Sequence, residues 1–345
     1  MARCLELAKR GQGNVAPNPM VGAVLVHDNT IIGEGFHQKY GGPHAEVNCI
    51  NDALQTAPQL VASSTLYVSL EPCAHFGKTP PCADLIVKHK IPKVVIACRD
   101  SFAEVNGRGI EKLKDAGIEV VECIMHTEAI ELNKRFFTFH SFKRPYIILK
   151  CAQTNDGYVA SNDGKRLLIT NEITNRLVHK WRSEEAGILV GVNTAIVDNP
   201  ILDNRNWYGN APVKIIIDPQ LKYTHELKLF QQGEKTIILN RVKEEEDGRS
   251  QFIKIYSDHI LSESLKRLFE KNVQSILVEG GSYTLQSFID AGIWDEARII
   301  TNTKLLISSG LSAPLLSGGE KTAEQFIFND RIEFFKNRNA TSGLL

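Results

Sequence analysis

The sequence predicts an α/β protein in which helices pack on mixed sheets, arranged as two successive domains. Short β-branched apolar runs alternate along the chain with segments whose apolar residues recur at helical spacing, which is typical of layered α/β folds. The length of 345 residues also favours two domains, since single cores stop growing near ~250–300 residues. The alternation restarts after the polar stretch 140–145, so we expect domains over residues 1–143 and 144–345.

The first half opens with a short predicted helix over residues 3–12, which ends at two glycines. The segment Pro17-Asn18-Pro19 then breaks any helix, because proline lacks the amide hydrogen. A hairpin is predicted from Met20–Val26 and Ile31–Gly35, with turn residues between them. The remaining elements are a helix opening at 44, strands over 65–70, 93–98 and 118–122, and helices over 83–90, 109–116 and 126–139.

The second half repeats the alternation, and we see no internal repeat. Residues 241–250 are rich in Glu and Lys and are expected to form a solvated excursion. Predicted strands cover 146–151, 187–191, 213–218, 236–239, 275–278 and 298–301, and predicted helices cover 171–184, 257–271 and 282–291.

Composition narrows the classes of function. Forty basic residues balance forty acidic ones, so no basic face indicates nucleic-acid binding and a small-molecule partner is expected. No apolar run reaches the ~18 residues of a membrane helix, which predicts a cytoplasmic protein without membrane contact. Seven irregularly spaced cysteines do not form a disulfide framework, so their thiols should be reduced. A homo-oligomer is also expected.

Three residues with the chemistry of zinc ligands stand close together in the sequence. His44 opens a predicted helix, Cys73 follows a strand and a proline, and Cys82 opens another helix. Three such ligands leave one position of a catalytic zinc open for water, and Glu46 is placed to carry protons. The alternatives are a structural metal site or no metal, with the cysteines acting as small apolar residues, as we expect for the other five. The combination resembles the zinc nucleobase deaminases, although eight residues separate the two cysteines where Cys-x-x-Cys is usual.

That longer spacer carries a more specific resemblance. Its pattern Pro72-Cys73-x-His75-x-Gly77-x-Thr79-Pro80-Pro81-Cys82, together with Pro17-Asn18-Pro19-x-Val21-Gly22 and His37-x-x-x-Gly41-x-Pro43-His44-Ala45-Glu46, is similar to the bifunctional deaminase/reductase family of riboflavin biosynthesis. The resemblance runs along most of the chain. It implies a cytidine-deaminase-like three-layer α/β/α domain followed by a dihydrofolate-reductase-like α/β domain.

The family resemblance also implies the chemistry. A water activated by one zinc ion per chain would deaminate 2,5-diamino-6-(ribosylamino)pyrimidin-4-one 5'-phosphate, with Glu46 moving the protons. NADPH would then reduce the ribosyl group to a ribityl chain. The positions that match the deaminase substrate contacts are Asn18, His37, His75 and Lys78, with Lys78 expected at the phosphate.

The second half lacks Gly-x-Gly-x-x-Gly, so a Rossmann dinucleotide site is not indicated. It does place Glu279-Gly280-Gly281 between a strand and a helix, where free amides can meet a phosphate, although the same pattern is common in tight turns. The family resemblance assigns the reductase substrate to Arg182, Leu202, Arg205 and Glu279. It assigns NADPH to Ala152, Thr194, Asp198 and the run Gly281, Ser282, Tyr283, Thr284, Leu285, Gln286 and Ser287, and polar assistance to Lys150 or Asp198.

Two departures from the family pattern concern the reductase contacts. Arg166-Leu167-Leu168 stands where many members carry Ser-x-Trp, and Pro219 stands where a serine is expected. One alternative is therefore a deaminase with an inactive reductase-like domain. Another is a nucleic-acid editing or binding protein built on a deaminase scaffold, which the balanced charge disfavours.

Overall fold

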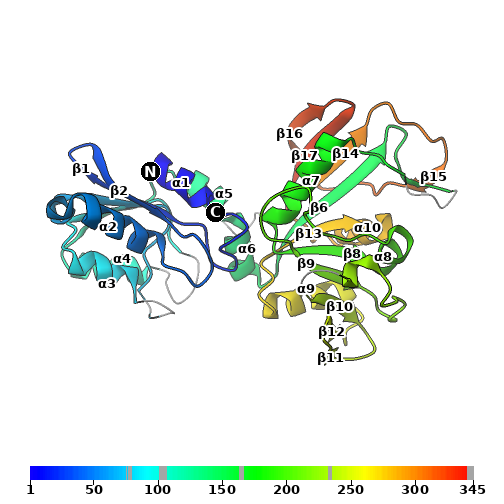
Figure 1. Ribbon diagram of the computed structural model, residues 1–345, viewed down its shortest axis with the longest axis horizontal. Coiled ribbons are helices and arrows are strands. Elements are labelled where there is room, and N and C mark those ends of the chain that lie inside the picture. The colour runs from blue at the N-terminus through cyan, green and yellow to red at the C-terminus, as the bar shows by residue number, and fades with distance from the viewer. Residues whose placement is uncertain (75, 77–79, 101–106, 163–166, 232–234, 340–345) are drawn as a thin grey trace. The chain divides into compact units, whose positions relative to one another are not determined.

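The computed structural model describes residues 1–74, 76, 80–100, 107–162, 167–231 and 235–339. The chain divides into two compact units, Met1–Phe142 and Lys143–Leu345 (Figure 1). Each unit has its own sheet and its own apolar core. Within the described ranges, no helix combines the length and the apolar character needed to cross a membrane.

The N-terminal unit is built on a five-stranded mixed sheet of order β2-β1-β3-β4-β5. The hairpin β1–β2 is antiparallel, as predicted, and β3, β4 and β5 run parallel to one another. The strands are β1 (Gly22–His27), β2 (Thr30–Phe36), β3 (Thr65–Val68), β4 (Lys93–Ile96) and β5 (Glu119–Val121).

Helices cover both faces of this sheet, which confirms the predicted three-layer α/β/α arrangement. Apolar residues of α2, α3 and α4 form one core with the strands, whereas α1 packs on the opposite face, against Val24, with α5 beside it. The helices are α1 (Ala2–Lys9), α2 (Ala45–Thr56), α3 (Cys82–Lys88), α4 (Arg108–Asp115), α5 (His126–Leu132) and α6 (Lys134–Phe142), with a 3-10 turn η1 (Pro58–Ser63).

The outer edge of β2 is capped by side chains of α2. Residues spaced one helical turn apart on α2 lie on one face, so they can follow the neighbouring strand. Asn48 Nδ2 donates to the Phe36 carbonyl at 2.8 Å, Asp52 Oδ2 accepts from the Glu34 amide at 2.9 Å, and Thr56 Oγ1 donates to the Ile32 carbonyl at 2.9 Å. The edge strand is therefore fixed to the helix that begins beside His44.

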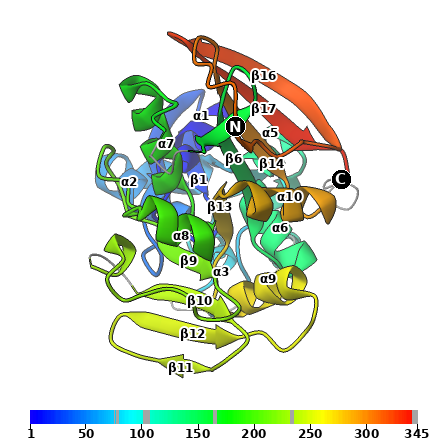
Figure 2. The same cartoon turned by 90° about the vertical axis from the view of Figure 1, so that its right-hand side faces the viewer.

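The C-terminal unit contains a ten-stranded sheet of order β11-β12-β10-β9-β8-β13-β6-β14-β17-β16, with β11 at one end and β16 at the other (Figure 2). Its central strands are parallel, and a separate ladder joins β7 to β15. The strands are β6 (Tyr146–Thr154), β7 (Tyr158–Ser161), β8 (Gly187–Gly191), β9 (Val213–Ile217), β10 (Thr236–Asn240), β11 (Glu245–Glu246), β12 (Ser250–Lys254), β13 (Ser275–Gly280), β14 (Glu296–Asn302), β15 (Gly310–Ser312), β16 (Gly319–Ile327) and β17 (Asp330–Asn337).

Alternate residues of the central strands point to opposite faces of this sheet. Ile147 and Leu149 of β6 join the core beneath α9 and α10, whereas Tyr146 and Ile148 pack with α7 on the other face. The helices are α7 (Glu172–Glu184), α8 (Val192–Asp198), α9 (Ile260–Glu270) and α10 (Ser282–Asp290), with a 3-10 turn η2 (Lys228–Phe230).

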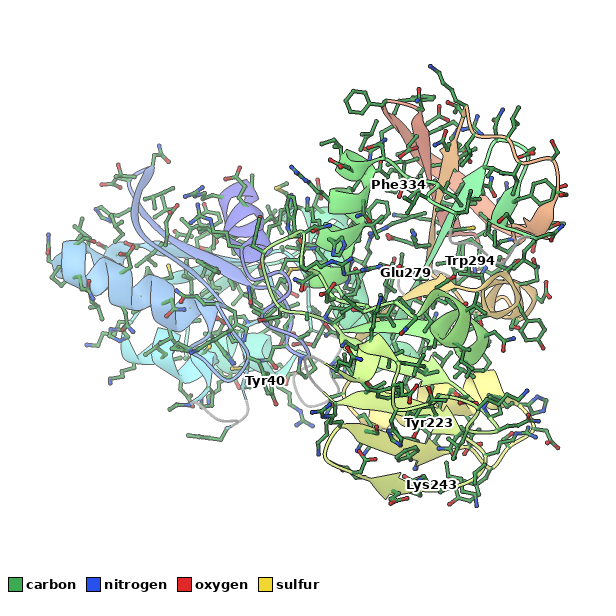
Figure 3. The ribbon with its side chains drawn as sticks, turned by 45° about the vertical axis from the view of Figure 1, so that its right-hand side comes forward. Tyr40, Tyr223, Lys243, Glu279, Trp294 and Phe334 are labelled. Carbon is green, nitrogen blue, oxygen red and sulfur yellow. The ribbon has the colours of Figure 1, made fainter. Side chains whose placement is uncertain are left out.

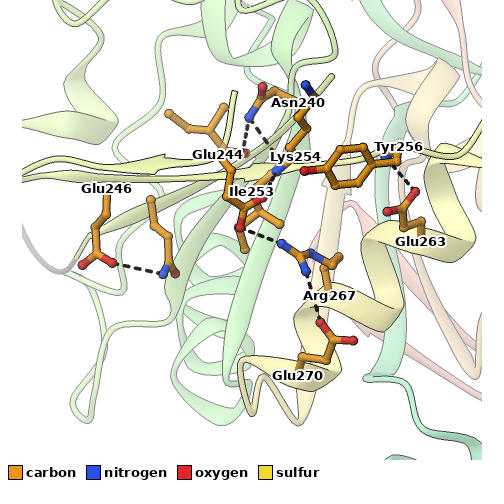
Figure 4. Close-up of polar contacts among 11 residues, drawn as sticks. Asn240, Glu244, Glu246, Ile253, Lys254, Tyr256, Glu263, Arg267 and Glu270 are labelled. Carbon is orange, nitrogen blue, oxygen red and sulfur yellow. Dashed lines mark hydrogen bonds and ion pairs between the residues drawn. The ribbon is translucent and has the colours of Figure 1, made fainter. Parts of the chain in front are cut away.

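One predicted element differs from the structure for an identifiable reason. The single helix expected over 126–139 is two helices, because the Asn133 side chain between them bonds the backbone N–H and C=O of Met20, both at 2.8 Å. The expected solvated excursion 241–250 is mostly exposed. Glu244 anchors it by accepting from the Lys254 amide and pairing with Arg267 at 2.6 Å (Figure 4). The sequence prediction also lacked α8 and strands β7, β11, β12 and β15 to β17.

Candidate functional site

The three predicted zinc ligands converge in the N-terminal unit. His44 is the residue before α2, Cys73 follows β3, and Cys82 is the first residue of α3. The ligand atoms all lie within 4.8 Å of one another, with His44 Nδ1 3.6 Å from Cys73 Sγ and 3.4 Å from Cys82 Sγ. One imidazole nitrogen and two sulfurs are a donor set that zinc prefers.

The local structure favours a thiolate at this cluster. The Cys82 backbone N–H, at the start of α3, donates to Cys73 Sγ at 3.3 Å. Hydrogen bonds from the Cys82 thiol and from His44 lower the pKa of Cys73, whereas the pKa of Cys82 is raised by the same shared hydrogen bond and by burial. The pair thus holds one proton between two sulfurs, and a bound cation would replace that proton.

Glu46 stands beside this cluster on the first turn of α2, with only 3 % of its surface exposed. Burial, followed by the nearby Cys73 sulfur, raises the pKa of Glu46 to about 7. A carboxyl group with a pKa near neutrality can both accept and release a proton under physiological conditions.

Two of the predicted deaminase substrate residues lie together next to the metal ligands. His37 is buried, its Nδ1 lies 2.9 Å from the Pro43 carbonyl oxygen, and its ring is 5.5 Å from that of His44. Because the carbonyl can only accept, His37 Nδ1 carries the hydrogen and Nε2 accepts from Asn18 Nδ2 at 3.1 Å. The other two predicted residues, His75 and Lys78, lie outside the described residues.

The C-terminal unit pairs two of the predicted reductase residues with each other. Arg182 on α7 meets Glu279 at the end of β13 through two parallel hydrogen bonds of 2.7 Å, a bidentate fork. Glu279 is labelled in Figure 3, and its side chain is 8 % exposed. Burial alone would raise the pKa of Glu279, but attraction by Arg182 and Lys150 and the Arg182 hydrogen bonds outweigh it and lower the pKa to about 2.

Asp203, which the sequence analysis did not single out, connects the two predicted arginines. Its carbonyl oxygen accepts from Arg182 Nη1 at 2.8 Å, and its carboxylate accepts from Arg205 Nη1 at 2.5 Å. Leu202 beside it is buried in the core, with a left-handed backbone (φ 58°). An acidic residue between two predicted substrate residues, Leu202 and Arg205, was the sequence signal that could have identified Asp203.

His179 is a second residue that the sequence analysis did not find. It lies one turn before Arg182 on α7, is 1 % exposed, and its Nδ1 has no hydrogen-bond partner among the described residues. Burial, then the charges of Arg182 and Arg205, lowers the pKa of His179 to about 4. The imidazole is therefore neutral at physiological pH.

The predicted cofactor residues on α8 and α10 approach each other through glycines. A Cβ on Gly281 would lie 2.8 Å from Thr194 Oγ1, and a Cβ on Gly191 would lie 2.4 Å from Thr284 Oγ1. Glycine at both positions leaves room for the two threonine hydroxyls. The first amides of α10, those of Ser282, Tyr283 and Thr284, have no acceptor within the helix and can meet an anion.

Later members of the same run are occupied within the protein. The Leu285 amide donates to the Gly281 carbonyl and its side chain lies in the core, whereas Ser287 Oγ donates to the Tyr283 carbonyl. Gln286 bonds both Asp290 and the Leu315 amide. Ala152 and Lys150 lie on β6, and Asp198 ends α8.

The two departures from the family pattern fall at different places. Leu168 is 76 % exposed, and Arg166 lies outside the described residues. Pro219 follows β9, where its carbonyl oxygen accepts from the Arg241 amide at 3.0 Å.

A third unpredicted residue, Glu71, stands directly before Pro72-Cys73 and is 4 % exposed. Its carboxylate accepts from backbone amides of a neighbouring segment. The sequence signal was an acidic residue between a buried strand and a metal ligand, because acidic residues are rarely buried without partners.

Two family models match successive parts of the chain. Residues 1–98 match the cytidine and deoxycytidylate deaminase zinc-binding region, and residues 145–327 match the RibD C-terminal domain. The riboflavin biosynthesis protein RibD of Aquifex aeolicus is 41 % identical over 90 % of this chain and 88 % of its own length. That of Escherichia coli is 35 % identical over 96 % of this chain and 94 % of its own.

Solved structures lead to the same family. The Thermotoga maritima protein described as a diaminohydroxyphosphoribosylaminopyrimidine deaminase/5-amino-6-(5-phosphoribosylamino)uracil reductase has a TM-score of 0.89 and 36 % identity, and covers 98 % of this chain and 97 % of its own. Acinetobacter baumannii RibD has a TM-score of 0.89 and 31 % identity, with 97 % of both chains covered. The chain thus belongs to the RibD family of riboflavin biosynthesis enzymes, which join a deaminase domain and a reductase domain in one polypeptide.

Proposed function

We propose that residues 1–143 deaminate 2,5-diamino-6-(ribosylamino)pyrimidin-4-one 5'-phosphate and that residues 144–345 reduce the product with NADPH. The observation that carries the proposal is the convergence of His44, Cys73 and Cys82 beside the buried Glu46. The Thermotoga maritima relative bears both activities in its description, and it covers nearly the whole chain.

The donor set of His44, Cys73 and Cys82 would hold one zinc ion per chain. A bound zinc lowers the pKa of a coordinated water and so supplies a nucleophile at neutral pH. Glu46 would pass one proton of the water to a pyrimidine ring nitrogen as the water oxygen bonds to the carbon that carries the amino group. It would then pass the second proton of that water to the amine as the carbon–nitrogen bond breaks. The products are ammonia and the corresponding uracil. Asn18 and His37, hydrogen-bonded to each other beside His44, orient the pyrimidine, and His75 and Lys78 in the spacer complete the contacts.

In the second step, bound NADPH would supply a hydride to C1 of the ring-opened ribose, which would be present as an imine, and a proton would reach the imine nitrogen. The task of the protein is to align the two molecules and supply the proton. Arg182, Arg205, Leu202 and Glu279 would hold the sugar phosphate, and the paired Arg182 and Glu279 are already oriented by each other.

The cofactor would lie where α8 and α10 approach. Thr194, Asp198, Ala152 and the start of α10 at Gly281 would contact NADPH, with the free amides of α10 facing its pyrophosphate. Lys150 attracts the Glu279 carboxylate, and Lys150 or Asp198 provides polar assistance to the proton transfer. A reducing cytoplasmic location agrees with the seven free cysteines. The homo-oligomer and the lack of nucleic-acid binding stay predictions.

One combined assay tests the proposal. The purified protein is analysed for zinc, then supplied with the pyrimidine substrate and NADPH while ammonia release and NADPH oxidation are followed. We expect one zinc per chain and consumption of both reagents. Ammonia release without NADPH oxidation, even with the deaminated intermediate added directly, would establish the alternative of an inactive reductase-like domain. Salt-dependent binding of single-stranded RNA would instead favour the nucleic-acid alternative.

A further inference from the structure

The carboxylate of Glu71 gathers backbone amides from a segment about thirty to forty positions later in the chain. Oε2 accepts from Asp100 N at 3.3 Å and Gly107 N at 3.0 Å, and Oε1 accepts from Gly109 N at 3.0 Å and Ile110 N at 3.4 Å. The side chain is buried, and it lies at the carboxyl end of β3. A carboxylate that accepts several N–H groups is strongly held in place, because charge-assisted hydrogen bonds are the stronger kind.

The amides that Glu71 holds come from residues before and after the stretch 101–106. Asp100 follows β4, whereas Gly109 and Ile110 are in the first turn of α4, whose free amides need acceptors. The Glu71 amide in turn donates to the Cys98 carbonyl at 3.0 Å. One residue therefore joins the ends of β3 and β4 and the start of α4.

This junction is adjacent to a zinc ligand in the sequence and in space. Pro72 separates Glu71 from Cys73, and the Pro72 carbonyl oxygen lies so close to Gly109 that a Cβ there would come within 1.9 Å of it. The backbone that leads into Cys73 thus packs against the start of α4, to which the Glu71 carboxylate is hydrogen-bonded. Cys73 Sγ then receives the Cys82 amide, which fixes the sulfur relative to the second ligand.

We propose that Glu71 is a positioning residue for the metal centre, acting through Cys73. The proposal rests on the deaminase function proposed above, since it concerns the same three ligands. Residues that orient metal ligands commonly change metal affinity or activity by roughly 10–100-fold when they are replaced. Glu71 would set the position of the Cys73 backbone, and therefore the distance between the two sulfurs, before any metal binds.

The first test compares Glu71→Gln with Glu111→Gln, a control on the exposed side of α4. The glutamine amide group would point a donor at backbone donors, so we expect zinc affinity, measured by chelator competition, to fall roughly 10–100-fold. Deamination at saturating zinc should fall as well, while NADPH-dependent reduction by the same chain stays at the wild-type rate. A Glu71→Gln protein that melts earlier but keeps wild-type zinc affinity and deamination has lost only structural support, and that result overturns the proposal.

The second test uses the wild-type protein and does not depend on a variant folding. Because coupling between two sites is reciprocal, zinc binding should protect the amides that Glu71 holds. We expect zinc to slow hydrogen exchange at Gly107, Gly109 and Ile110 by a larger factor than in β5. Equal protection in both places contradicts the proposal. If the wild-type protein neither binds zinc nor releases ammonia, the proposed deaminase function fails instead, which separates the two failures.

Discussion

Each unit of the protein buries a glutamate that is predicted to act at its candidate site, and these two, Glu46 and Glu279, are in opposite electrostatic situations. Glu46 is 3 % exposed and has two sulfurs and an imidazole beside it, and its pKa is raised to about 7, chiefly by burial. Glu279 has a similarly buried side chain, yet the fork with Arg182 and the charge of Lys150 overcome burial and lower its pKa to about 2.

The difference shows how neighbouring groups assign distinct tasks to one residue type. A buried carboxyl without an arginine or lysine partner exchanges its proton near neutral pH and suits a proton carrier. A buried carboxylate in a bidentate pair stays ionised and suits a fixed anchor for a second group. We therefore expect Glu46 to serve proton transfer and Glu279 to serve orientation.

The largest expected effect is on the proton carrier. Glu46→Gln keeps the shape of the side chain but cannot accept a proton, so deamination should fall by roughly 10²–10⁴-fold. Zinc content should remain at the wild-type level, because the ligands are unchanged, and NADPH oxidation with the deaminated intermediate should be unaffected. Ammonia release and metal analysis on one preparation measure the deamination rate and the zinc content. Full activity of the variant would show that Glu46 does not move protons.

Removing Arg182, the cation that pairs with Glu279, should destabilise the C-terminal unit. Arg182→Ala leaves Glu279 as an uncompensated buried charge, which typically costs about 3–5 kcal/mol. The three tryptophans, Trp181, Trp207 and Trp294, all lie in this unit, so their fluorescence during urea unfolding follows it alone. The exposed Arg176→Ala on the same helix is the control and should change little. A double replacement of Arg182 and Glu279 by methionine should regain much of the loss, and equal midpoints for Arg182→Ala and Arg176→Ala would refute the role of the pair.

Acid should weaken the same unit through Glu279. Its pKa is about 2 in the folded protein against an ordinary value of 4.5, so the unfolded state binds the proton more readily. The stabilisation is present above pH 4.5 and is lost as the pH falls towards 2, by up to about 3 kcal/mol. Tryptophan-detected unfolding at pH 5 and pH 3 measures the change. The loss should be smaller in Glu279→Gln, and an unchanged pH dependence would exclude Glu279 as its source.

The smallest expected effect concerns the N-terminal caps of α7 and α2. Asn171 caps α7, where its side chain accepts from the Thr174 amide at 3.0 Å, whereas His44 stands at the same position of α2 and makes no such bond. At the start of α2, the His44 imidazole instead faces the sulfurs of Cys73 and Cys82. The Asn171 Nδ2 also donates to the Ile327 carbonyl at 2.8 Å and to Asp330 at 2.7 Å, and both replacements lose these bonds. Asn171→Ala also loses the cap, so it should cost about 1 kcal/mol more than Asn171→Ser, which can still cap. No difference between the two would indicate that the capping bond contributes nothing.

The sequence predicted what short stretches of chain determine. The residue types and spacing of His44, Glu46, Cys73 and Cys82 indicated the metal cluster. The strand-helix alternation indicated helices packed on a mixed sheet, and the family resemblance supplied the three-layer arrangement. Contacts between segments that are distant in the sequence could not be predicted from such local patterns. The Arg182–Glu279 fork spans 97 positions, and Glu71 reaches amides 29 to 39 positions away.

Elements stabilised by tertiary contacts escaped prediction for the same reason. The break at Asn133 depends on Met20, which is 113 positions away. Strand β16 is exposed on most of its length, so it has no alternating apolar pattern, and only its pairing with β17 defines it. Local patterns cannot report such pairings, because the stabilising partner is absent from the sequence window.

The side chains that α2 places along β2 restrict how this protein can meet other chains. Sheets recruit peptides by donating and accepting backbone hydrogen bonds at an open edge, and on β2 three of those groups are already taken by Asn48, Asp52 and Thr56. A peptide that added a strand there would have to displace the helix that begins at His44. Strand addition at this edge would therefore disturb the metal cluster, so any partner that docks on β2 without loss of deamination must use side chains instead of the backbone.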